Sequence, residues 1–151
     1  MAKKVVIVGG GFGGIAVAKQ LSSNTFDVTL IDKTNHHLFQ PLLYQVATAA
    51  LSPGDIATPI RAVFTNQKNI KVVLGEVVDV NSSENSVSLK NGRTISFDYL
   101  ILAPGAKYNY FGNSAWEAHA PGLKTLSNAL KLREKILLSL EKAEQLPTAK
   151  E

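Results

Sequence analysis

A run of six residues near the N-terminus, five of them glycine, constrains the fold of this chain more than any other feature. Residues 9–14 (GGGFGG) fit the pattern G-x-G-x-x-G and directly follow residues 4–8, an apolar, β-branched segment typical of a strand buried on both faces. Residues 15–21 then have the pattern of a short helix, and residues 26–31 that of a second strand, which ends at Asp32. Together they predict a β-α-β unit with parallel strands.

The spacing of the glycines indicates a turn that binds phosphate. In such a motif the first glycine permits the tight turn, the second lets backbone approach a pyrophosphate, and the third lets the helix pack closely on the strand. These roles fall on Gly9, Gly11 and Gly14. A glycine-rich turn kept for packing alone also fits the pattern. The preceding strand, the following helix and the acidic residue at the end of the next strand together favour a dinucleotide site.

Asp32 is that acidic residue, 18 residues after Gly14. We expect its carboxylate to accept hydrogen bonds from both hydroxyl groups of a ribose. A 2′-phosphate on that ribose would be repelled by the Asp32 carboxylate, because like charges repel strongly where the dielectric constant is low. Asp32 therefore argues against a ligand with a 2′-phosphate.

The rest of the chain predicts an α/β fold in which other elements interrupt the parallel sheet. Residues 34–64 are expected to form short helices and loops, with helix starts at residues 52–55 and 58–59. Four alternating segments follow and are expected to form an antiparallel meander, with a hairpin turn at Asn91-Gly92; they are residues 70–74, 76–80, 86–90 and 94–97.

Two further elements complete the chain. Residues 99–103 (YLILA) are fully apolar and suit a return to the parallel sheet, before a break at Pro104-Gly105. Residues 125–144 predict an amphipathic helix, whose leucine-rich face we expect to lie in the core.

Composition excludes several classes of function. The chain has 151 residues and no cysteine, so it contains no disulfide, thiolate metal site or cysteine nucleophile. Its net charge is +4, but the basic residues are scattered, so no nucleic-acid partner is expected. His36 and His37 are adjacent and diverge on a helix or a strand, which favours local hydrogen bonds or support of a ligand loop over metal binding. We expect neither a metal site nor a catalytic side chain.

The sequence contains no candidate membrane span or secretion signal. No apolar run approaches the roughly 18 residues of a transmembrane helix. The N-terminus imitates a signal peptide, but the glycine run would fray the apolar helix that such a peptide needs. We therefore expect a cytoplasmic protein.

Four stretches carry a resemblance to a known family and are more specific than the glycine motif. They are residues 39–48 (FQPLLYQVAT), 51–61 (LSPGDIATPIR), 99–112 (YLILAPGAKYNYFG) and 120–125 (APGLKT). With them the chain resembles the type II NADH dehydrogenases, single-subunit flavoenzymes that pass electrons from NADH to quinone. The inserted helical segment and meander also resemble the two-dinucleotide-domain flavoproteins more than a simple nicotinamide domain.

The resemblance implies that FAD binds to this chain. The implied pyrophosphate contacts are Gly9, Gly11, Phe12, Gly13 and Gly14, with Ala103 and Gly105 from the later Ala-x-Gly segment. Pro104 stands where the wider superfamily often has threonine, which removes a hydroxyl and an N–H but keeps the turn.

The remaining implied contacts lie on the adenosine and the flavin. Asp32 and Lys33 would hold the ribose, and Val78 would present backbone to the adenine. Gln45 and Thr48 would lie near the flavin ring. Transfer of hydride and electrons through a flavin needs no protein nucleophile, in agreement with the absence of a convincing one.

The resemblance covers only part of the family's length. Residues 1–145 are expected to be the incomplete N-terminal portion of a Rossmann-like FAD-binding domain, and residues 146–151 a linker toward a downstream NADH-binding domain. NADH and quinone would be the substrates of the complete enzyme. That enzyme is expected to associate with the cytoplasmic face of the cell membrane through a downstream C-terminal region. A homodimer is the assembly considered for it.

Two alternatives stay open at this point. One is a different flavoprotein reductase of the same superfamily, of the ferredoxin or sulfide:quinone type, although the absence of cysteine tells against sulfide and disulfide chemistry within this segment. The other is a nucleotide-binding module with no activity alone.

Overall fold

The computed structural model describes residues 1–21 and 24–146. Within them the chain divides into two compact units. The first consists of Met1–His37 and Thr58–Ala106, and the second of Leu38–Ala57 and Lys107–Glu151 as far as it is described. A single domain over residues 1–145 remains a prediction. The linker predicted over residues 146–151 lies outside the described residues apart from Leu146.

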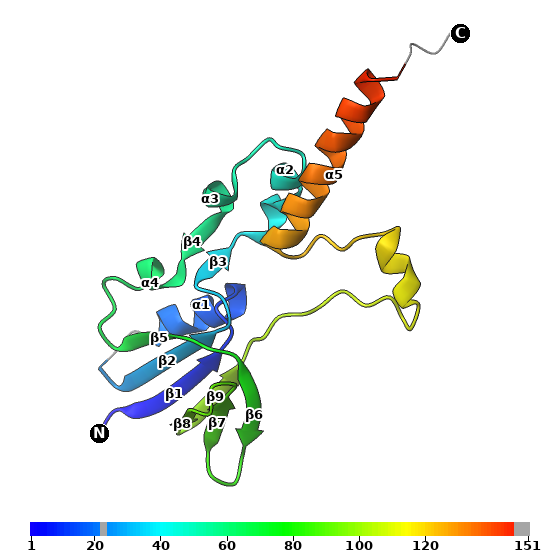
Figure 1. The fold of residues 1–151 in the computed structure, drawn as a ribbon. Helices are drawn as coiled ribbons and strands as arrows, with labels where there is room; N and C mark the ends of the chain where they lie inside the picture. Colours follow the sequence, from blue (N-terminus) through cyan, green and yellow to red (C-terminus); the bar gives the residue numbers. More distant parts are fainter. Residues whose placement is uncertain (22–23, 147–151) are drawn as a thin grey trace. The chain divides into compact units, whose positions relative to one another are not determined.

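The first unit is built on a four-stranded parallel sheet (Figure 1). Its strands, in spatial order, are β5 (Ile70–Leu74), β2 (Phe26–Asp32), β1 (Lys3–Val8) and β9 (Tyr99–Leu102). Helix α1 (Phe12–Gln20) connects β1 to β2, which pair in register from Lys3↔Phe26 to Val8↔Ile31. The predicted β-α-β unit and the return of the YLIL segment to this sheet are confirmed.

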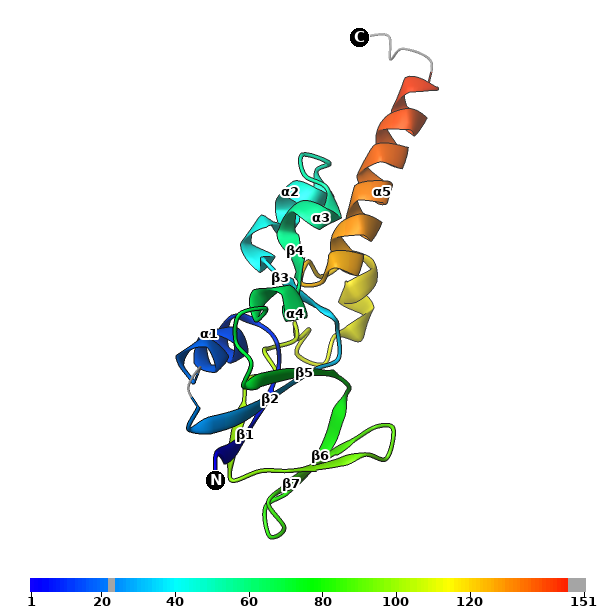
Figure 2. The same ribbon diagram turned by 90° about the vertical axis from the view of Figure 1, so that its left-hand side faces the viewer.

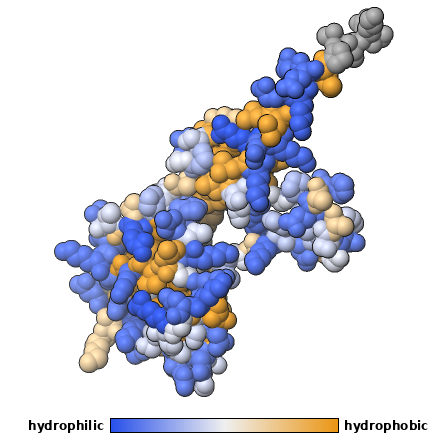
Figure 3. Space-filling view, in the orientation of Figure 1, coloured by the Kyte–Doolittle hydropathy of each residue, from blue (hydrophilic) through white to orange (hydrophobic). Residues whose placement is uncertain are grey.

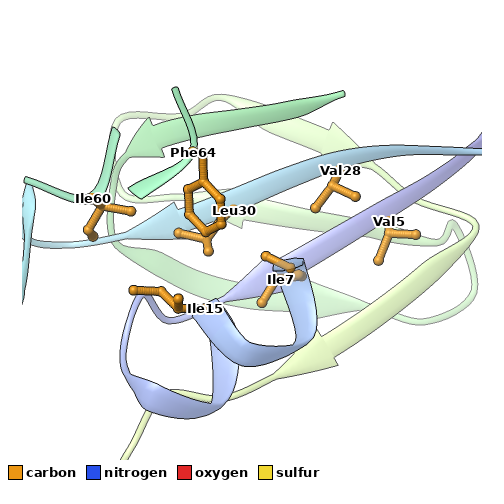
Figure 4. Packing of buried hydrophobic residues seen from close by; sticks show 8 residues of the cluster. Val5, Ile7, Ile15, Val28, Leu30, Ile60 and Phe64 are labelled. Carbon is orange, nitrogen blue, oxygen red and sulfur yellow. The ribbon is translucent and has the colours of Figure 1, made fainter. Parts of the chain in front are cut away.

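Both faces of the parallel sheet are covered, which explains the consecutive apolar residues Val5–Val8 of β1 and the buried Val28, Leu30 and Ile31 of β2. On one face, side chains of β1 and β2 pack against α1 and the segment that contains α4 (Ile60–Val63), as Figure 4 shows for Val5, Ile7, Val28, Leu30, Ile15, Ile60 and Phe64. Each such side chain contributes about 1.5–3 kcal/mol on burial.

An antiparallel sheet covers the other face (Figure 2). It consists of β6 (Val77–Asn81), β7 (Ser86–Leu89) and β8 (Thr94–Ser96), with the predicted hairpin turn at Gly92 between the last two. Val87 and Leu89 of β7 pack against Val6 and Ile31 of the parallel sheet.

The assignment of residues 70–74 to the antiparallel meander is wrong. β5 pairs with β2 in parallel, from Val28↔Ile70 to Asp32↔Leu74, and forms an edge of the main sheet. An edge strand is partly exposed: Val73 is buried, whereas Lys71 and Leu74 are exposed. Alternation therefore reports that one face of a strand is more buried than the other, and it does not distinguish a parallel edge from an antiparallel ribbon.

Residues 34–64 contain more structure than the short helices and loops expected there. The elements are β3 (His36–Leu38), η1 (Gln40–Leu42), α2 (Leu43–Ala47), α3 (Pro53–Ile56), β4 (Ala57–Pro59) and α4. β3 and β4 pair as a two-stranded sheet where the chain passes from one unit to the other and back. The helix start at Ser52 is confirmed by a capping box with Asp55, whose pKa is lowered because its carboxylate accepts hydrogen bonds from Ser52.

The second unit has a small core of its own. Leu43, Val46 and Ala47 of α2 pack with Ile56 and with Ala129 of α5 (Leu126–Glu144). The unit also contains η1, α3 and a further short helix, η2 (Ser114–Ala118). α5 begins after Thr125, whose side chain accepts a hydrogen bond from the Asn128 N–H.

The expectation that the leucine-rich face of α5 lies in the core is wrong for this chain. Only Ala129 of this helix is buried, whereas Leu137, Leu138 and Leu140 are 44%, 52% and 60% exposed. Figure 3 shows hydrophobic residues, in orange, on the surface of this part of the chain. The reason is that α2 packs against the N-terminal turns of α5 alone. No helix in the described part of the chain is both long and apolar enough to cross a membrane.

Candidate functional site

The turn between β1 and α1 depends on two glycines that tolerate no side chain. Gly9 has φ +109°, and a Cβ atom there would overlap the carbonyl oxygen of Ala103. A Cβ atom at Gly14 would overlap the carbonyl oxygen of Gly9. The first glycine therefore makes the turn, and the last lets the start of α1 lie directly against the end of β1.

Gly11 and Gly13 leave space outside the turn, whereas a Cβ atom at Gly10 would meet the side chain of Ile60. A Cβ atom at Gly11, the N-cap of α1, would have no atom within 4 Å, and one at Gly13 would lie 3.7 Å from the Ala103 Cβ. No acidic side chain is present in the first turn of α1. Open space, backbone N–H groups and the positive end of a helix dipole make this a suitable place for an anionic group.

The Ala103–Gly105 segment lies beside the glycine turn, as the sequence predicts. The Ala103 N–H donates to the Val8 carbonyl (2.8 Å), which extends the pairing of β9 with β1 by one residue. Gly105 has φ +75°, and space is open at its Cβ position. Two backbone segments from distant parts of the sequence thus meet at one edge of the sheet, at the C-terminal ends of the strands, where nucleotides bind in folds of this kind.

Asp32 lies at the same edge and holds the turn from the side of β2. Its Oδ2 accepts a hydrogen bond from the Gly10 N–H (2.5 Å), and its Oδ1 accepts from the N–H and the hydroxyl of Thr34 (2.6 Å each). A carboxylate has about four acceptor positions, so three are engaged within the chain. The hydrogen bonds to ribose hydroxyls remain a prediction. Thr34 was not among the predicted site residues, although a D-x-T turn is a recognisable local motif.

His37 contacts the turn at the Gly10 carbonyl, whereas Asp32 contacts the Gly10 N–H. Its Nδ1 lies 3.1 Å from the Gly10 carbonyl oxygen, and its ring meets that of Phe12 edge to face, with 5.0 Å between centroids. His36 lies instead with its Nδ1 3.4 Å from Asn35 Oδ1. The divergence of the two histidines agrees with the prediction. No group of three or more potential metal ligands occurs among the described residues.

A cavity of about 350 Å³ is lined by residues of α1 and by His37 of β3, Thr58 of β4 and Val63 of α4. It does not include Gly9, Gly11 or Asp32. We therefore place the candidate anion site at the open side of the glycine turn and not in this cavity.

The other predicted contacts lie in different surroundings. Val78 is 59% exposed and lies where the register between β6 and β7 shifts, between Val77 and Asp79, so that its backbone stands outside the regular ladder. Lys33 is exposed. Gln45 and Thr48 belong to the second unit, where both side chains hydrogen-bond to Tyr44, and their proximity to a ligand remains a prediction.

Residues 3–143 match the family described as "Pyridine nucleotide-disulphide oxidoreductase". The chain is 49% identical, over 93% of its length, to the type II NADH:quinone oxidoreductase NdhA of Mycobacterium tuberculosis, of which it covers 31%.

Two solved structures have the same fold with a TM-score of 0.85 each. One is NDH2 of Plasmodium falciparum in complex with NADH, at 30% identity over 99% of this chain and 32% of that one. The other is the sulfide:quinone oxidoreductase of Aquifex aeolicus, at 29% identity over 93% of this chain and 33% of that one. The chain thus spans about a third of the length of the proteins it resembles.

Proposed function

This chain belongs to the pyridine nucleotide-disulphide oxidoreductase family, and we propose that it is the FAD-binding, N-terminal part of an NADH:quinone oxidoreductase. The observation that carries the proposal is the open glycine turn at the start of α1, with Asp32 and the Ala103–Gly105 segment at the same edge of the sheet. The identity of 49% to an NADH:quinone oxidoreductase supports this activity over others in the family.

The residues present fit the dinucleotide. Backbone of Gly11, Phe12 and Gly13 would bind the pyrophosphate, since the turn leaves room there and the helix dipole favours negative charge. Gly9 and Gly14 would act by allowing the turn to form, and Ala103 and Gly105 would border the phosphates.

The adenosine and flavin contacts follow from the remaining predicted residues. Asp32 and Lys33 would hold the ribose, the irregular backbone at Val78 would meet the adenine, and Gln45 and Thr48 would lie near the flavin ring. Bound FAD would supply two-electron chemistry between a hydride donor and an acceptor. The chain's own part is to bind and orient the cofactor.

The substrates of the complete protein follow from the same assignment. NADH would bind in a domain downstream of this chain, and quinone would accept the electrons. We propose that the complete protein is peripheral to the cell membrane on its cytoplasmic face, with membrane contact through its C-terminal region, and that it forms a homodimer.

A sulfide:quinone reductase is the second candidate. It is favoured by one observation, the TM-score of 0.85 to the Aquifex aeolicus enzyme, which equals that to NDH2. Fold similarity therefore does not separate the two, whereas sequence identity supports the NADH enzyme.

An assay of the native protein separates these candidates. The protein that contains this sequence is isolated from its source cells with an antibody against the chain, and reduction of a short-chain quinone is measured with NADH or with sulfide as the donor. We expect quinone reduction with NADH as the donor and none with sulfide, and we expect the isolated protein to release FAD when it is denatured. Turnover with sulfide alone would support the second candidate, and turnover with neither would contradict both.

A residue-level prediction concerns the ribose contact of Asp32. The chain is titrated with FAD and with an FAD analogue that lacks the 2′-hydroxyl of the adenosine. We expect the chain to prefer FAD by about tenfold, because a hydrogen bond to a charged acceptor contributes about 1.5–3 kcal/mol. Asp32→Ala should bind both ligands weakly and with equal affinity.

The control for this prediction is Asp27→Ala, which alters an exposed carboxylate of the same strand and should retain the preference. Asp32→Ala also removes the hydrogen bonds to Gly10 and Thr34, so its affinity alone is not diagnostic. The loss of preference between the ligands is the diagnostic result. If Asp32→Ala still prefers FAD to the analogue, Asp32 does not bind the ribose hydroxyl.

A further inference from the structure

The side chain of His37, on β3, contacts the peptide unit that joins Gly10 to Gly11. The Gly10 carbonyl oxygen lies 3.1 Å from His37 Nδ1. A carbonyl only accepts, so this nitrogen carries the hydrogen and donates it. The preceding peptide is held as well, because its Gly10 N–H donates to Asp32. Two successive peptide units are therefore anchored, one by an acid and one by an imidazole.

The geometry of the peptide bond transmits this anchoring to the open side of the turn. In a planar trans peptide the C=O and the following N–H point in opposite directions. The bond from His37 to the Gly10 carbonyl therefore directs the Gly11 N–H away from His37. Space at Gly11 is open, with no atom within 4 Å of its Cβ position.

The same imidazole also contacts the first residue of the helix. Its ring meets Phe12 edge to face, with 5.0 Å between ring centroids, an arrangement that aromatic pairs prefer. His37 thus touches both the turn and the start of α1.

We propose that His37 is a positioning residue for the dinucleotide pyrophosphate, which aims the Gly11 N–H at the phosphate by holding the Gly10 carbonyl. The inference rests on the proposed binding of FAD. His37 itself does not touch the ligand; it removes the need to order the turn when the phosphate binds, and preorganisation of this kind raises affinity.

The test compares a variant that keeps the donor with one that loses it. In His37→Asn the amide nitrogen lies close to the position of Nδ1 and can donate. His37→Leu introduces an apolar side chain that has no hydrogen-bond donor. His36→Leu is the matched control, because His36 lies on the same strand and has no hydrogen bond to the turn among its described contacts. FAD affinity of the 151-residue chain is measured by titration, and folding is checked by circular dichroism.

We expect His37→Leu to bind FAD about tenfold more weakly, His37→Asn to stay within about threefold of the original chain, and His36→Leu to be unchanged. In the chain without FAD, the NMR order parameter of the Gly11 N–H should fall in His37→Leu alone. Rescue by asparagine is the result that a purely structural role of the imidazole would not produce.

Three outcomes overturn the inference. If His37→Leu binds FAD as tightly as the original chain, the hydrogen bond from His37 to the Gly10 carbonyl does not contribute to binding. If the order parameter is unchanged, that hydrogen bond does not order the Gly11 N–H. Asparagine as weak as leucine would show that the donor is not the cause. If the original chain binds no FAD, the proposed function fails with the inference, whereas tight binding with no effect of His37 removes the inference alone.

Discussion

Replacement of Gly14 by alanine is expected to lower the free energy of unfolding of the first unit by at least about 2 kcal/mol, although alanine is the better helix former. Gly14 lies in α1 and is buried, and a Cβ atom there would overlap the Gly9 carbonyl oxygen and lie 3.4 Å from Ile7 Cγ2. Because the obstacle is backbone, it moves only if α1 shifts away from β1. The gain of about 1 kcal/mol in helix propensity is smaller than this cost.

The neighbouring glycine of the same helix provides the matched control. Gly13 is exposed, and a Cβ atom there would make an ordinary contact of 3.7 Å with Ala103 Cβ. Gly13→Ala should therefore leave stability unchanged or raise it by up to about 1 kcal/mol. Urea unfolding of both variants measures the difference. Equal stability of the two variants would mean that the close approach of α1 to β1 is not required by the fold.

The second large effect is expected on binding and not on folding. Gly11→Val fills the open side of the turn, where nothing lies within 4 Å of the Cβ position. Gly11 has an extended backbone (φ −80°, ψ −165°), which valine adopts readily, so stability should change by no more than about 1 kcal/mol. FAD affinity should fall by at least about 100-fold, because the branched side chain occupies the approach of the pyrophosphate to the backbone N–H groups.

A valine at another open glycine serves as the control for this loss. Gly54 lies in the first turn of α3, and its nearest neighbour at the Cβ position is Ser52 Oγ at 3.8 Å. Gly54→Val should bind FAD like the original chain in a flavin fluorescence titration. Retained affinity in Gly11→Val would place the pyrophosphate elsewhere and remove the main support for the proposed function.

Local chemistry was enough to predict the first β-α-β unit and the later segment that joins it. The positive φ at Gly9 and the contact of Gly14 with backbone are requirements that glycine alone meets, so the motif carries its own geometry. Residues 99–102 return to the parallel sheet as their continuous apolar character predicts, although β9 is an edge strand on which Tyr99 and Leu102 are exposed. The capped start of α5 at Thr125 is local in the same way.

The site was predictable to a similar extent. The spacing of the motif led to Gly9, Gly11, Gly14 and Asp32, all of which lie at one edge of the sheet. The hydrogen bond that His37 makes to the turn was not predictable in detail. It joins residues 27 positions apart, and no local pattern marks such a pair.

Sequence alone thus determined the first β-α-β unit and the glycine turn within it, because both depend on neighbouring residues and on backbone angles. The place of β5 beside β2, the exposure of the leucines on α5 and the partners of Asp32 depended on the tertiary structure. The physical reason is that periodicity shows which side of an element is apolar, whereas burial and pairing depend on which distant segment packs against that side.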